Sequence, residues 1–313
     1  MAYQNGIELE IGNITMNAVA EAVRSAGGIL LNTESGDNRV YGYHSSPRTF
    51  RGLNYQDSAN TEVPVWRLES DSSIYGNEEG CANGMGLNHR GVGELISPII
   101  YGASGNKHII KVVLRLKRAG AVMTRLMGAH ITLGVNNNSR WARFSDSKKQ
   151  KVGLRLAQTY KHFEGVFDAI SPNTRQMIGR DAQSYGYCSA VNMSRPFNNR
   201  TSALNMTRFV QSGIVEFRQP GHTLQTKNIE GWLKIVNAVV GSAMNDNKRT
   251  KRGEKSMTCD ITTYPQTVEG MMDFLNPGSK TEEWTVRRVM HLATTYSQNR
   301  THRMACLETQ EVA

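Results

Sequence analysis

Near its start the chain reads Gly6-Ile7-Glu8-Leu9-Glu10-Ile11, in which apolar and acidic residues alternate. This period of two predicts a β-strand, because successive side chains of a strand point to opposite faces of the sheet. The apolar residues then face the core, and Glu8 and Glu10 share the other face, about 6.5–7 Å apart. Carboxylates so placed repel each other, which leaves two interpretations: a bound divalent cation such as Mg2+ or Mn2+, or a polar strand edge facing solvent.

Outward from this strand, the hydrophobic pattern mixes strands and helices without a regular alternation. Strands are predicted at 65–68, 94–98, 130–135 and 213–218, and helices at 16–23, 106–118, 148–170, 229–240 and 284–296. The helix at 148–170 has the clearest pattern, with apolar residues stepping by three and four along one face. Because βαβ units do not recur, we expect an α+β fold with a largely antiparallel sheet and flanking helices.

A basic run at 247–252 is the best candidate for a linker. It predicts a main domain at 1–245 and a helical C-terminal extension at 246–313, packed on the core. The run, which continues to Lys255, is interpreted as a solvated loop, a lid or a contact for an acidic partner.

Composition narrows the class of protein. The 313 residues include 37 Lys and Arg against 27 Asp and Glu, a formal net charge of +10. This balance favours anionic partners such as nucleotides, phosphates or nucleic acid, or it is merely a solvated basic surface. No apolar run reaches the ~18–20 residues of a membrane helix, so no membrane partner is expected. The oligomeric state is not indicated.

The spacing of the cysteines and the N-terminal residues indicate the cellular compartment of the protein. The four cysteines, at 81, 188, 259 and 306, form no CxxC pair, which predicts reduced thiols in a cytosol. The first residues lack the basic and apolar segments of a signal peptide. We therefore expect a cytoplasmic protein, in the host cytoplasm if a bacteriophage encodes it. The sequence also lacks a P-loop, a GxGxxG fingerprint and a GxSxG elbow.

Four further segments hold candidate site residues, and for each the ordinary structural interpretation is given beside any functional one. In Glu216-Phe217-Arg218 the two charged residues share a strand face. They are either a surface ion pair or a metal ligand next to an arginine that binds phosphate. His130 enters its strand after two small residues and is either a ligand or an ordinary polar residue. Glu94 lies near the end of a strand, where it is either a metal ligand or part of a salt bridge. Asp71 lies in a turn, where Asp often caps its own backbone.

In this order, the segments resemble the putative amidoligase family, a branch of the carboxylate–amine ligases that share the glutamine synthetase-like catalytic fold. The resemblance spans about residues 6–240. It rests on five blocks: Gly6 to Glu10, Trp66 with Asp71-Ser72, Glu94 with Ser97-Pro98, Gly128 with His130, and Asn205 to Trp232 including Ile214-Val215-Glu216-Phe217-Arg218. The 1–245 domain is then the catalytic one.

The resemblance implies an ATP- and Mg2+-dependent (or Mn2+-dependent) ligase that forms an amide or isopeptide bond through an acyl phosphate. It implies that Glu8, His130 and Glu216 surround the metal ion that bridges the nucleotide phosphates. It further implies that Glu10 and Glu94 hold a metal ion nearer the carboxylate substrate.

The remaining roles also come from the resemblance. Arg218 steadies the transferred γ-phosphoryl group and, with Asn205, contacts the nucleotide, while Glu216 counts among the catalytic residues. Asp71 accepts a proton from the incoming amine or orients it. The substrates are a small-molecule or peptide carboxylate and an amine.

The chain departs from the family pattern in two places. The usual second His, two residues after the first, is Thr132 here, and the common apolar residue before the first His is replaced by Gly128-Ala129. Two other functions stay open: a non-catalytic nucleic-acid or virion-associated binding protein on the same fold, and a phosphotransferase like the guanidino kinases.

Overall fold

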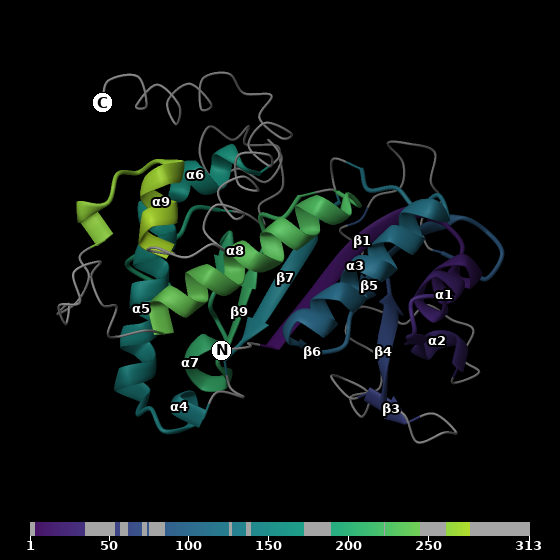
Figure 1. The fold of residues 1–313 in the computed structure, drawn as a ribbon, viewed down its shortest axis with the longest axis horizontal. Coiled ribbons are helices and arrows are strands. Elements are labelled where there is room, and N and C mark those ends of the chain that lie inside the picture. The colour runs from purple at the N-terminus through teal and green to yellow at the C-terminus, as the bar shows by residue number, and fades with distance from the viewer. Residues whose placement is uncertain are drawn as a thin grey trace. The chain divides into compact units, whose positions relative to one another are not determined.

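The computed structural model describes ten stretches of the chain, 4–34, 54–56, 62–70, 74, 85–124, 127–135, 139–171, 189–221, 223–244 and 261–275 (Figure 1). The chain forms two compact units. The N-terminal unit comprises Ala2–Thr132 and His222–Glu230, and the C-terminal unit comprises Met1, Leu133–Gly221 and Gly231–Ala313.

The N-terminal unit is built on a sheet whose strands run in the order β2-β4-β5-β1-β7, with β3 beside β4 and β6 beside β1. These strands are β1 (Gln4–Ile14), β2 (Ile29–Leu30), β3 (Asn54–Gln56), β4 (Glu62–Glu69), β5 (Gly91–Ile96), β6 (Ile100–Tyr101) and β7 (Ala129–Gly134). Strand β5 pairs antiparallel with both β1 and β4, whereas β2 pairs parallel with β4. Two long antiparallel neighbours therefore flank β5.

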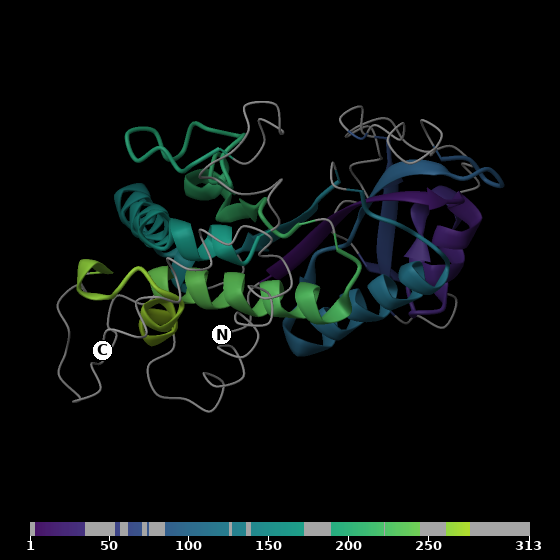
Figure 2. The same cartoon turned by 90° about the horizontal axis from the view of Figure 1, so that it is seen from above.

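Among the described residues, the helices that lie wholly in this unit are α1 (Met16–Arg24), α2 (Leu31–Glu34) and α3 (Gly102–Arg118). Helices α1 and α3 lie on the same face of the sheet (Figure 2). Thr15 caps α1, since its hydroxyl oxygen accepts the Ala18 N–H at 3.2 Å. Ile7, Leu9 and Ile11 are buried, as the alternation of β1 predicts.

The C-terminal unit contains β8 (Leu204–Asn205) paired antiparallel with β9 (Ile214–Phe217). Its helices are α4 (Ser139–Ala142), α5 (Asp146–His162), α6 (Glu164–Ala169), α7 (Phe209–Ser212), α8 (Thr226–Met244) and α9 (Val268–Leu275), with a 3-10 turn, η5 (Ile261–Thr263). Both β7 and α8 contribute residues to each unit. Gly213, at φ 66°, ends α7 in the left-handed conformation that lets β9 begin at once.

The structure confirms the α+β class and the mostly antiparallel sheet. One predicted element is different: the helix expected at 148–170 is two helices, broken at Phe163, where φ is −97° and ψ is 23°. The break keeps Tyr160, Phe163 and Phe167 all buried, so the apolar pattern continues across it.

The predicted linker at 247–252, the boundary at 245/246 and the helix at 284–296 lie outside the described residues. The two-domain division and the glutamine synthetase-like fold therefore stay predictions. Among the described helices, none has both the length and the apolar composition that crossing a bilayer requires.

Candidate metal centre

The pairing of β1 with β5 places two carboxylates face to face. In this register Glu10 lies directly opposite Glu94, and Glu8 lies opposite Ile96. Glu10 is 5% exposed and Glu94 is 3% exposed. The interpretation of a solvent-facing strand edge is therefore wrong for Glu10. Like charges opposite one another in a sheet are destabilising, and burial strengthens the repulsion.

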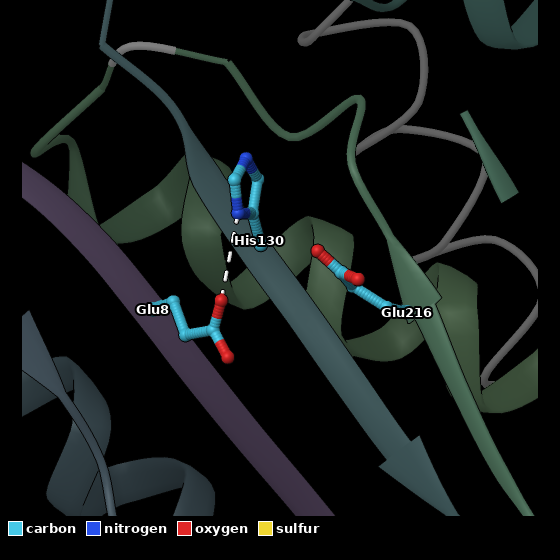
Figure 3. A group of neighbouring side chains, drawn as sticks. All are labelled: Glu8, His130 and Glu216. Atoms are coloured by element: carbon cyan, nitrogen blue, oxygen red, sulfur yellow. Dashed lines mark ion pairs between the residues drawn. The ribbon is translucent and has the colours of Figure 1, made fainter. Parts of the chain in front are cut away.

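A histidine from β7 stands beside these acids. His130 is 3% exposed, and its Nδ1 lies 3.6 Å from Glu8 Oε2 while its Nε2 lies 3.8 Å from Glu10 Oε1. Figure 3 draws the ion pair between Glu8 on β1 and His130 on β7, with Glu216 on β9. The imidazole is thus held between the two carboxylates of β1.

The Glu10 side chain is fixed by the backbone that leads into β7. Its Oε2 accepts the Gly128 N–H at 2.6 Å, and the Glu10 N–H donates to the Gly128 carbonyl at 3.0 Å. Gly128 therefore holds both the main chain and the carboxylate of Glu10. This contact gives a structural role to the Gly128–His130 block.

The three buried residues Glu10, Glu94 and His130 each offer one ligand atom, and these atoms all lie within 4.8 Å of one another. An octahedral ion with ligands at about 2.1 Å sets neighbouring ligand atoms about 3 Å apart and opposite ones about 4 Å apart. Carboxylate oxygens, the majority of these donors, suit hard cations such as Mg2+ or Mn2+. The donor set therefore fits a hard divalent cation, whose charge would offset the facing carboxylates.

A serine fixes the end of β5 against β1. Ser97 Oγ accepts the Ile7 N–H at 2.8 Å and donates to the Pro98 carbonyl at 2.9 Å, and the Ser97 N–H donates to the Ile7 carbonyl at 2.9 Å. The Ser97-Pro98 pair of the resemblance thus stabilises the register that sets Glu94 opposite Glu10.

Trp66, another residue of the resemblance, is structural. It is buried on β4, and its indole N–H donates to His108 Nε2 on α3 at 2.9 Å. Burial lowers the pKa of His108, and the nearby charge of Lys111 lowers it further by a smaller amount. A hydrogen bond with the backbone of Ala26 raises this pKa, but less than burial lowers it. The neutral imidazole is the form that can accept the indole N–H.

In the C-terminal unit, Glu216 is held through both carboxylate oxygens. Asn205, its partner in the β8–β9 register, donates from Nδ2 to Glu216 Oε2 at 2.7 Å, and Arg218 Nη1 donates to Glu216 Oε1. The side chains of Glu216 and Arg218 are 15% and 12% exposed. The ion pair of the first interpretation is therefore present, and both of its side chains are partly buried.

Two buried residues that the sequence did not single out for a role lie on β4. Glu69, which is fully buried, sits opposite Glu94, and its Oε1 lies 3.0 Å from Arg67 Nη1. The signal was present, because Arg67 and Glu69 alternate with Trp66 and Leu68 as the acids of β1 alternate with apolar residues. The strand pairing that makes them relevant is tertiary. Asp71 lies outside the described residues.

Residues 2–144 match the family described as "Putative amidoligase enzyme". This segment carries the amidoligase family pattern. The prediction of family is confirmed over this segment, which contains Glu8, Glu10, Glu94 and His130. Glu216 and Arg218 lie beyond the matched amidoligase segment. The chain matches none of the curated proteins.

Proposed function

We propose that this protein is an ATP- and Mg2+-dependent carboxylate–amine ligase that forms an amide or isopeptide bond. The observation that carries the proposal is the buried group Glu10, Glu94 and His130 within the segment that matches the amidoligase family. Facing carboxylates are costly in a core, and such violations of ordinary packing concentrate at functional sites.

The proposed chemistry answers a problem of electrophilicity. A carboxylate is a poor electrophile, and its oxygen is a poor leaving group. Its oxygen first attacks the γ-phosphorus of ATP, which forms an acyl phosphate and releases ADP. The amine nitrogen then attacks the carbonyl carbon, the C–N bond forms, the C–O bond to phosphate breaks, and a base takes the proton that the nitrogen loses.

Glu10, Glu94 and His130 are the proposed metal ligands of the N-terminal unit, with Glu8 beside His130 as a further carboxylate. When bound, a divalent cation neutralises phosphate oxygens and aligns the phosphoryl group. The protein residues supply oxygen and nitrogen donors, of which Glu10, Glu94 and His130 are buried. Exclusion of water matters because an acyl phosphate otherwise hydrolyses.

From the C-terminal unit, the resemblance adds Glu216 as a metal ligand, Arg218 as the group that steadies the transferred phosphoryl group, and Asn205 as a nucleotide contact. The hydrogen bonds to both Glu216 oxygens support a fixed orientation of that carboxylate. A guanidinium offers a planar pair of donors that matches phosphate oxygens. Asp71 is retained as the proposed base or orienting group for the amine.

The function is tested with ATP, Mg2+ and a metabolite extract, with ADP release and new amide products followed by mass spectrometry. The wild-type protein is expected to form an amide product, and Glu94→Gln and Glu216→Gln are expected to lose it while keeping the fold. Glu21→Gln serves as the control, since Glu21 is an exposed residue of α1.

Other outcomes separate the rival functions. ADP release with a phosphorylated acceptor and no amide indicates a phosphotransferase. No ADP release with any fraction of the extract, together with measurable binding of nucleic acid, indicates a binding protein. Full amide formation by Glu94→Gln would show that the metal assignment is wrong.

A further inference from the structure

Three acids form a row across the sheet of the N-terminal unit. The register places Glu10 of β1 opposite Glu94 of β5, and Glu94 opposite Glu69 of β4. Residues directly opposite each other in a sheet share a face. All three are buried, with exposures of 5%, 3% and 0%. A row of three buried negative charges needs compensation at more than one point.

Arg67 compensates one end of this row. It lies two positions before Glu69 on β4, therefore on the same face, and its Nη1 is 3.0 Å from Glu69 Oε1. Its side chain is 11% exposed, so solvent screens the pair little. The same register places Arg67 opposite Ile96, which in turn lies opposite Glu8.

The row is thus divided into two parts. Glu10 and Glu94 converge with His130, whereas Glu69 is not among the candidate metal ligands that the described residues provide. The Glu69 carboxylate is paired with the guanidinium of Arg67. Unlike a bound metal ion, this cation is a permanent part of the chain. The Arg67–Glu69 pair adds no net charge beside the candidate metal centre.

We propose that Arg67 is a positioning residue that sets the metal affinity of the Glu10–Glu94–His130 centre by neutralising Glu69. The inference rests on the proposed function, because it takes that centre as the metal site. Loss of Arg67 leaves an extra negative charge near the cation, and loss of Glu69 leaves an extra positive one. The two single changes therefore shift the metal affinity in opposite directions, and the double change cancels the shift.

The size of the shift follows from the sheet. Two strand spacings of about 4.8 Å separate the backbones of Glu69 and Glu10, so the charges lie roughly 10 Å apart. One unit charge acting on a dication at that separation, at an effective dielectric of 20 to 40, changes the affinity by about tenfold or more.

The test measures Mn2+ affinity by electron paramagnetic resonance in the absence of nucleotide, on the full chain. Arg67→Gln is expected to bind Mn2+ at least about tenfold more tightly than wild type, and Glu69→Gln at least about tenfold more weakly. The double variant is expected to return close to wild type, and Arg67→Lys, which keeps the charge, to stay close to it. Circular dichroism establishes that each variant is folded.

The outcomes separate the two proposals. If wild-type protein binds Mn2+ and Glu94→Gln does not, the metal centre stands; weaker binding in both single variants, or no recovery in the double variant, then overturns the role of Arg67 alone. If Arg67→Gln does not fold, the comparison of Glu69→Gln with the double variant decides, because only the charge mechanism predicts recovery. If wild-type protein binds no Mn2+, both proposals fall.

Discussion

Replacing Glu94 by glutamine removes one of two facing buried charges and keeps the size of the side chain. The ligand atoms of Glu10 and Glu94 lie within 4.8 Å of each other. At that separation and an effective dielectric of about 20, two unit charges repel by about 3 kcal/mol. Without metal, Glu94→Gln is therefore expected to be more stable than wild type, by up to about 3 kcal/mol less any hydrogen bonding that the carboxylate made.

A divalent cation is expected to change the relative stability of wild-type protein and Glu94→Gln. An ion present at about one hundred times its dissociation constant stabilises the protein that binds it by about 2.7 kcal/mol. Wild-type protein should gain this stabilisation from Mn2+, whereas Glu94→Gln, which lacks one charged ligand, should gain little. The advantage of the variant in chelator should shrink or vanish when Mn2+ is added.

Urea unfolding with and without Mn2+ measures both effects, with EDTA present in the metal-free series. Glu21→Gln is the matched control, since Glu21 is an exposed residue that pairs with Arg24 on α1 and should change stability by less than about 0.5 kcal/mol. The reasoning is refuted if Glu94→Gln is less stable than wild type in EDTA and still shows the full stabilisation by Mn2+.

Three further changes test the framework around the centre. Because burial lowers the pKa of His108, its contribution to stability is present above the unfolded pKa of about 6.5 and is lost as the pH falls through the folded value; His108→Gln should flatten this part of a pH series of urea unfolding. Ser97→Ala leaves the buried Ile7 N–H without its acceptor and should cost about 1–3 kcal/mol, measured by urea unfolding. Thr15→Ala removes the cap of α1 and should cost about 1 kcal/mol, whereas Thr15→Ser should cost less than half of that in the same assay.

Local pattern was sufficient for the longer strands and helices, but not for short elements such as β2, β8 and α7. The alternation from Ile7 to Ile11 predicted β1, and Thr15 with the apolar spacing after it predicted the start of α1. The strand and the helix start depend on residues that are close together in the sequence, so they can be predicted from the sequence alone. The break at Phe163 was missed because the apolar period continues through it; only packing shows that the helix ends at His162.

For the site, the sequence supplied candidate residues, and the resemblance supplied their roles. The proposed metal ligands Glu10, Glu94 and His130 come together in the structure. Hydrogen bonds connect Glu216 to Asn205 and Arg218. The role of Asp71 stays a prediction.

What the sequence alone determined is the order of the longer strands and helices, the shared face of Glu8 and Glu10, and the family pattern of residues 2–144. Only the tertiary structure decided that Glu94 and then Glu69 lie in line with Glu10, and that Arg67 neutralises the last of them. The physical reason is register. A slip of one residue between strands reverses which side chains share a face, and no local pattern in β4 or β5 specifies that register.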